Sequence, residues 1–125
     1  MTKQKKILVI DDNEDVLTTI TQFLTQKKFN VLSASNGLDA LKQCEVEKEN
    51  IDLIITDLVM PSISGVAIIS IVKEKYPQIP IIAITGWGEH PESLAAEAKA
   101  DTVMEKPFDL SELLDKIEEL IDKNQ

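Results

Sequence analysis

Residues 51–57 read Ile-Asp-Leu-Ile-Ile-Thr-Asp, a short aliphatic run that ends on a carboxylate. The run is rich in β-branched residues, which predicts a strand buried on both faces, as in a parallel sheet. Residues 7–10 and 79–84 have the same character. Residues 29–34 and 101–104 predict two weaker strands nearer the sheet edges.

Segments with helical spacing separate these runs. One covers residues 16–24, and the clearest covers residues 110–121, where apolar residues recur every three or four positions. Candidate caps stand at the start of both segments: Asp11, Asp12 and Asn13 for the first, and Asp109 or Ser111 for the last.

Two further helices are less regular. Leu38, Leu41 and Val46 mark the apolar side of one. The other, about residues 65–76, is apolar nearly all the way round, which is unusual for a surface helix. It is either a well-buried helix, the more ordinary interpretation, or a helix with a partner-binding face.

Strand and helix alternate five times with short connections. This order predicts right-handed βαβ units and an α/β fold with a five-stranded parallel sheet, covered on both faces by five helices. Because the sequence contains no repeat, linker or low-complexity tract, residues 1–125 are predicted to form one domain.

Composition excludes several classes of function. The 125 residues carry a formal net charge of −9, which would repel a phosphate backbone, so direct nucleic-acid binding is not expected. No apolar run approaches the roughly 20 residues of a membrane span. The single cysteine, Cys44, cannot form an internal disulfide, and no Cys/His cluster suggests zinc. A cytoplasmic location is expected, and the sequence favours no particular oligomeric state.

Polar residues follow four of the expected strands. Asp11 and Asp12 follow the first strand, Asp57 the third, Thr85 the fourth and Lys106 the fifth. Each alone has an ordinary explanation as a helix cap, a turn residue or a solvated lysine. Ligands of open α/β sheets bind at the carboxyl ends of the strands, so the joint placement predicts one site.

The predicted site suits phosphoryl chemistry. Three clustered carboxylates repel one another unless a cation lies among them, and oxygen ligands favour Mg²⁺, with Mn²⁺ as an alternative. A carboxylate can attack phosphorus to give an aspartyl phosphate. A lysine and a threonine hydroxyl could then stabilise the phosphoryl oxygens.

The predicted site residues lie in four segments of the sequence. The segments are Ile-Leu-Val-Ile-Asp-Asp at 7–12, Asp-Leu-Ile-Ile-Thr-Asp-Leu-Val-Met-Pro at 52–61, Ile-Ile-Ala-Ile-Thr at 81–85 and Lys-Pro-Phe at 106–108. They resemble the signature segments of two-component response-regulator receiver domains, a chemotaxis-regulator-like family. The likeness covers essentially the whole chain, and the motifs occur in the family's order and spacing.

The resemblance implies a phosphorelay switch rather than an enzyme that turns over a substrate. Asp57 would accept a phosphoryl group from a sensor histidine kinase or phosphotransfer protein, and a downstream effector protein or domain would receive the signal. Asp11, Asp12 and Asp57 would hold Mg²⁺, helped by the backbone carbonyl of Val59. The only chemistry would be self-directed phosphotransfer and autodephosphorylation.

The resemblance also implies a flavodoxin-like fold with strand order 2-1-3-4-5. Lys106 would pair with the phosphoryl group, and its bond to Pro107 would be cis. Thr85 would move toward a phosphoryl oxygen and shift the surface around the fourth helix and fifth strand.

Some positions depart from the family pattern. Val103 stands where an aromatic switch residue is frequent, and Trp87, close to Thr85 in sequence, is a candidate substitute. Lys99 replaces a common glycine, so we expect that turn to be built differently. Val59 and Trp87 offer no side chain to orient a hydrolytic water, which predicts slow loss of the phosphoryl group.

Three other classes of protein share features with this sequence. A haloacid-dehalogenase-type phosphohydrolase would need an aspartate at Val59, and a flavodoxin would need a Ser/Thr/Gly-rich loop in place of the acidic residues 11–15. A pseudo-receiver would bind partners without phosphorylation. The sequence argues against a pseudo-receiver because it keeps Asp12, Asp57, Thr85 and Lys106. A phosphorylation experiment distinguishes the two classes.

Overall fold

A parallel sheet forms the centre of the molecule. The computed structural model describes residues 4–47, 49–58, 60, 63–86 and 99–123. The sheet has five parallel strands in the order β2-β1-β3-β4-β5, which confirms the expected flavodoxin-like topology. The strands are β1 (Lys6–Ile10), β2 (Asn30–Ala34), β3 (Leu53–Asp57), β4 (Ile81–Thr85) and β5 (Thr102–Glu105).

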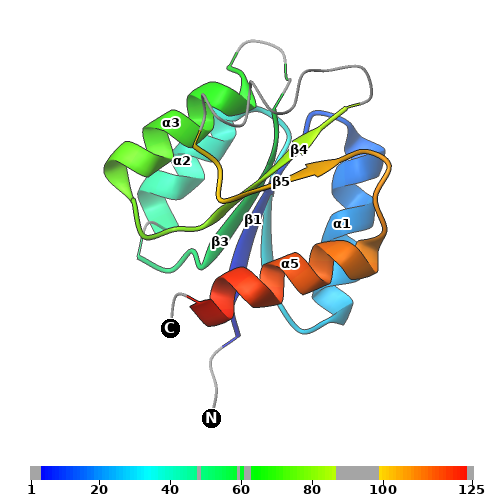
Figure 1. Ribbon diagram of the computed structural model, residues 1–125. Coiled ribbons are helices and arrows are strands. Elements are labelled where there is room, and N and C mark those ends of the chain that lie inside the picture. The colour runs from blue at the N-terminus through cyan, green and yellow to red at the C-terminus, as the bar shows by residue number, and fades with distance from the viewer. Residues whose placement is uncertain (1–3, 48, 59, 61–62, 87–98, 124–125) are drawn as a thin grey trace.

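Helices cover both faces of the sheet. In Figure 1, α2 and α3 lie on one side of the strands, and α1 and α5 lie on the other. The described residues contain four helices, and the remaining expected helix falls on residues 87–98, outside the described ranges. Across those ranges, no helix has the length and apolar character needed to cross a bilayer. The helices are α1 (Glu14–Gln26), α2 (Gly37–Glu47), α3 (Gly65–Lys75) and α5 (Leu110–Lys123).

The central strands are buried along their whole length. Every residue of β3 and β4 is buried, whereas the edge strands β2 and β5 have exposed positions. Side chains of a strand point alternately to its two faces, so a strand covered on both sides has no polar face. This burial explains why β3 and β4 read as continuous aliphatic runs.

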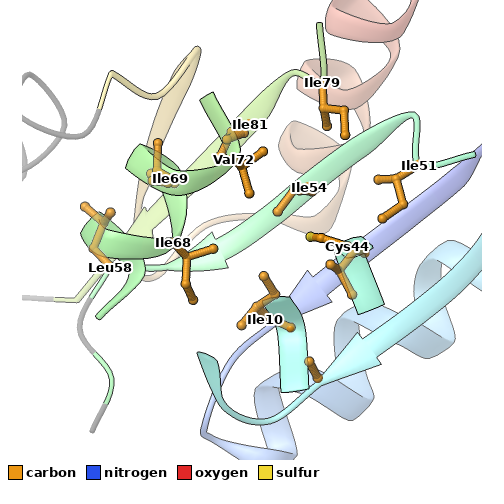
Figure 2. Close-up of a cluster of buried hydrophobic side chains, with 14 of the residues drawn as sticks. Ile10, Cys44, Ile51, Ile54, Leu58, Ile68, Ile69, Val72, Ile79 and Ile81 are labelled. Carbon is orange, nitrogen blue, oxygen red and sulfur yellow. The ribbon is translucent and has the colours of Figure 1, made fainter. Parts of the chain in front are cut away.

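Two hydrophobic clusters hold the layers together. On the α2/α3 side, Ile10 and Ile54 of the sheet pack with Ile68 of α3, as Figure 2 shows. On the other side, Ile55 packs with residues of α1 and α5 such as Ile20. The helical stripes predicted for residues 16–24 and 110–121 supply this second cluster.

The apolar helix α3 is largely buried. Ile68, Ile69 and Val72 have no exposed surface and point into the cluster of Figure 2. Val66 also packs against that cluster, as a partly buried residue. The structure therefore supports the interpretation of a well-buried helix over that of a partner-binding face.

Helix α2 presents only part of the expected face to the core, where Leu41 packs as a partly buried residue. Leu38 and Val46 are 57% and 80% exposed, so their assignment to the apolar side was wrong. Ala40 and Cys44 face the core instead. Gly37 lies so close to Ile63 that an added Cβ would come within 2.6 Å of that side chain. Small residues line this face because the helix packs closely there.

Burial makes Cys44 a protonated, unreactive thiol. It raises the pKa of Cys44 from 9.0 to about 11, and the thiolate is the nucleophilic form. We expect the native protein to resist iodoacetamide at about pH 8, and the urea-unfolded chain to react. The same shift stabilises the fold below pH 9.0, and that contribution is lost as the pH rises toward about 11. Rapid alkylation of the native protein would contradict this assignment.

The turn before β5 contains a lysine in the left-handed conformation. Lys99 has a φ of 62°, the backbone geometry that a glycine would adopt. The expectation of a differently built turn was therefore wrong. A left-handed conformation costs a residue other than glycine roughly 1–2 kcal/mol, and Lys99 is exposed.

A polar staple joins β4 and β5 at their amino ends. The Lys73 ammonium lies 2.6 Å from Asp101 Oδ2 and donates to the Ile79 carbonyl at 3.2 Å. The same Asp101 oxygen accepts the Ile81 N–H at 2.8 Å. Helix α3 and the start of β5 are thus both tied to β4.

Candidate functional site

Three carboxylates meet at the carboxyl edge of the sheet. Asp11 follows β1, Asp12 comes next, and Asp57 ends β3. One oxygen from each carboxylate lies within 4.8 Å of the others. Asp11 and Asp57 are 1% and 6% exposed, while Asp12 is exposed. The residues predicted from strand ends are therefore neighbours in space.

Parallel register brings the two buried carboxylates together. Ile10 of β1 pairs with Thr56 of β3, so the residue after each of them lies at the same level of the sheet. The Asp11 N–H donates to the Ala34 carbonyl at 3.1 Å and continues the β1–β2 ladder. The two buried carboxylates thus follow β1 and β3, two of the strands that the aliphatic runs predicted.

A tight turn orients Asp11. The backbone N–H of Asn13 donates to Asp11 Oδ1 at 2.9 Å, and the Asn13 side chain caps α1 by accepting from Asp15 and Val16 N–H. Asp11 Oδ2 is buried and has no hydrogen-bond partner among the described residues. A buried oxygen of this kind is available for a cation. Asn13 was predicted only as a cap candidate; its place two residues after Asp11 was the signal for this second role.

Lys106 supplies a positive charge beside these carboxylates. Its ammonium lies 3.5 Å from Asp11 Oδ2 and 3.7 Å from Asp57 Oδ2. Its backbone N–H donates to the Thr85 carbonyl at 2.8 Å, which fixes the end of β5 against the end of β4. The Lys106–Pro107 bond is cis, as the resemblance implied.

Thr85 ends β4 with a buried hydroxyl. The residue has no exposed surface, and its Oγ1 has no hydrogen-bond partner in the part of the chain that the structure describes. Leaving a buried polar group unpaired costs roughly 1–3 kcal/mol. An acceptor oxygen brought to this edge would therefore be stabilised by Thr85.

Of the remaining predicted residues, the structure describes two and leaves two outside the described ranges. Val103 lies on β5 opposite Ala83 and is 36% exposed, and Pro107 is exposed. Val59 and Trp87 lie outside the described residues, so their predicted roles stay predictions.

The donor set fits a hard cation. Among the described residues the candidate ligands are carboxylate oxygens, and two of them come from buried side chains next to an ammonium. Mg²⁺ takes such ligands and shares them with phosphate oxygens. Fold and site together define a doubly wound α/β domain with an acidic edge whose carboxylates fit a hard cation.

Comparison with known proteins places this domain in a family. The family described as Response regulator receiver domain matches residues 7–118. The chain is 32% identical over 122 residues to the alkaline phosphatase synthesis transcriptional regulatory protein PhoP of Bacillus subtilis, covering 97% of this chain and 50% of PhoP. This chain belongs to the response regulator receiver domain family.

Solved structures of response regulators share the fold of this chain. A response regulator receiver domain protein from Clostridium thermocellum superimposes with a TM-score of 0.88 at 32% identity, over 95% of each chain. The response regulator protein TrrA from Thermotoga maritima, in complex with Mg²⁺-BeF, gives a TM-score of 0.82 at 32% identity, over 94% of this chain and 99% of that chain. The chain spans about half or less of the length of the curated relatives that it matches.

Proposed function

We propose that this chain is a phosphorylation-controlled switch in a phosphorelay. Asp57 accepts a phosphoryl group from a phosphohistidine of a sensor histidine kinase or phosphotransfer protein, and the altered surface signals to an effector protein or domain. The observation that carries this proposal is the cluster of three carboxylate oxygens within 4.8 Å, with the Lys106 ammonium beside Asp11 and Asp57.

Asp11, Asp12 and Asp57 would hold Mg²⁺, together with the Val59 carbonyl, which lies outside the described residues. TrrA, a relative of this chain, was solved with Mg²⁺-BeF, which supports Mg²⁺ over Mn²⁺. When bound, the ion supplies positive charge beside the phosphoryl oxygens.

The chain's own residues perform the transfer. A carboxylate oxygen of Asp57 attacks phosphorus while the bond from phosphorus to the donor nitrogen breaks, and an acyl phosphate results. The Lys106 ammonium pairs with a phosphoryl oxygen, and the Thr85 hydroxyl donates to another. Thr85 gains the hydrogen bond that its buried oxygen lacks among the described residues, which couples phosphorylation to the end of β4.

An apolar hollow beside the site suits a protein phosphodonor. It has a volume of about 390 Å³ and lies between α1 and the segment that joins β5 to α5. Lys106 lies on its rim, so a partner seated there would reach the phosphoacceptor edge. The apolar lining is supplied by Val16, Ile20, Pro107, Phe108 and Leu110.

Further parts of the proposal concern the whole chain. Residues 1–125 form one receiver domain that works in the cytoplasm. The domain turns over no separate substrate and binds neither nucleic acid nor membrane directly, as the net charge of −9 favours.

The test is to incubate the protein with acetyl phosphate and Mg²⁺ and to record its intact mass. We expect a single phosphoryl adduct that a chelator prevents. If Mg²⁺ binds and no adduct forms, a phosphorylated histidine kinase replaces acetyl phosphate as the donor. Failure with both donors, or absence of Mg²⁺ binding, would favour the pseudo-receiver.

The adduct should be long-lived. Neither Val59 nor Trp87 carries a side-chain acceptor that could take a hydrogen bond from an attacking water, so hydrolysis lacks a positioned nucleophile. We expect decay over minutes or longer once the donor is removed, followed by intact mass at intervals. Decay within seconds would contradict this prediction, and a Val59→Asn variant that decays faster would support it.

A further inference from the structure

We propose that Thr56 is a positioning residue for the phosphoacceptor, acting through the backbone carbonyl of Asp57. The inference rests on the proposed function of Asp57. It concerns a residue that strand patterning marks only as part of the buried core, because Thr56 has no exposed surface and lies in the middle of the sheet.

The contact is local and buried. Thr56 is paired with Ile10 of β1 and Ala83 of β4, so neighbouring strands enclose it on both sides. Its Oγ1 donates to the Asp57 carbonyl oxygen at 3.0 Å. A buried hydroxyl needs an acceptor, and this one is satisfied by the backbone of the residue that would carry the phosphoryl group.

The same peptide is fixed from other directions. An added Cβ on Gly65 would lie 2.7 Å from the Asp57 carbonyl carbon and closer still to its oxygen, so α3 begins directly against this group. The Leu58 N–H donates to the Ile84 carbonyl at 2.9 Å, and the Leu58 carbonyl accepts from Gly65 N–H at 3.0 Å. Thr56 completes a set of contacts that holds the backbone on which the Asp57 carboxylate is mounted.

The fold alone gives no reason for a hydroxyl at this position. Valine has nearly the same shape, is equally suited to a strand and buries no polar group. By strand alternation Thr56 shares the α2/α3 face with Ile54, which lies two residues earlier in a hydrophobic cluster. The hydrogen bond to Asp57 is the feature that distinguishes Thr56 from an aliphatic residue.

Loss of this hydrogen bond should affect the transfer step more than donor binding. Small misplacements of a reacting group reduce rates strongly, while the donor is held by other groups. With acetyl phosphate and saturating Mg²⁺, we expect Thr56→Val to lower the maximal rate of adduct formation about tenfold. The donor concentration for half-maximal rate should stay within about twofold of the native value.

Two further variants make the test specific. Thr56→Ser keeps the donor and should restore most of the rate. Ile54→Val removes a methylene from the same face of the same strand, and it should leave the rate within about twofold although the core is perturbed. The ¹³C resonance of the Asp57 carbonyl should shift in Thr56→Val and keep its native position in Thr56→Ser.

The outcomes separate the two proposals. If native protein forms no adduct with any donor, the proposed function fails, and the role of Thr56 fails with it. If native protein forms the adduct and Thr56→Val forms it at the native rate, only the role of Thr56 is overturned. A Thr56→Ser variant as slow as Thr56→Val, or an unshifted carbonyl resonance in folded Thr56→Val, would also overturn it.

Discussion

Asp57→Asn protein is expected to form no adduct with acetyl phosphate and Mg²⁺ under conditions in which native protein is fully labelled. An amide oxygen is neutral and is a much weaker nucleophile than a carboxylate oxygen. Asp57 is buried at the end of the central strand β3, where the Lys106 ammonium lies 3.7 Å from its Oδ2. The expected loss is complete rather than partial, and intact mass spectrometry measures it directly.

A matched control separates chemistry from charge. Asp39→Asn makes the same replacement of a carboxylate by an amide at an exposed position on α2. This variant should form the phosphoryl adduct to the same extent as native protein. Asp57→Asn should still fold, because asparagine keeps the shape and removes one charge from a cluster of like charges. Full phosphorylation of folded Asp57→Asn would show that another residue is the phosphoacceptor.

Gly65→Ala is expected to destabilise the fold by about 3 kcal/mol, a large share of a small domain's stability. The added methyl would overlap the Asp57 carbonyl and lie 2.7 Å from Leu58 Cα, and both neighbours are backbone atoms that cannot rotate away. Either α3 must withdraw or the end of β3 must bend. Urea unfolding followed by circular dichroism gives the change in free energy of unfolding.

Ser70→Ala on the same helix is the control for this substitution. Ser70 is exposed, so its replacement should change the free energy of unfolding by less than about 0.5 kcal/mol. A native-like stability for Gly65→Ala would show that α3 can shift at no cost. The tight approach could then not be what fixes the peptide after Asp57.

Sequence patterns predicted the centre of the fold better than its edges. The strands β3 and β4 are buried on both faces, and that environment leaves an unbroken aliphatic run. The prediction of the core face of α2 was wrong at Leu38, which faces solvent, because Ala40 and Cys44 form that face. Close packing selects small residues, which a search for large apolar side chains passes over.

The candidate site was predictable for a topological reason. In a parallel sheet the carboxyl ends of the strands share one edge, so Asp11, Asp57 and Lys106 could be brought together before any distance was known. Thr56 and Gly65 were not singled out. The Thr56 contact with the Asp57 carbonyl depends on a side-chain rotamer, and the Gly65 contact depends on how closely α3 approaches β3. Such approach distances are set by the packed layers and leave little trace in spacing.

The staple between Lys73 and Asp101 gives β5 two unlike ends. One end is anchored to β4 through Asp101, while the other leads into Lys106 at the acidic edge. Between these ends β5 is paired with β4 along its length, and the Lys106 N–H donates to the Thr85 carbonyl at 2.8 Å. Movement of the Lys106 ammonium toward a phosphoryl group would therefore act on the ends of β4 and β5 together. The exposed side chains of Val103 and Glu105 lie on the strand that leads into Lys106, so this movement would reach the molecular surface without any ring having to turn at Val103.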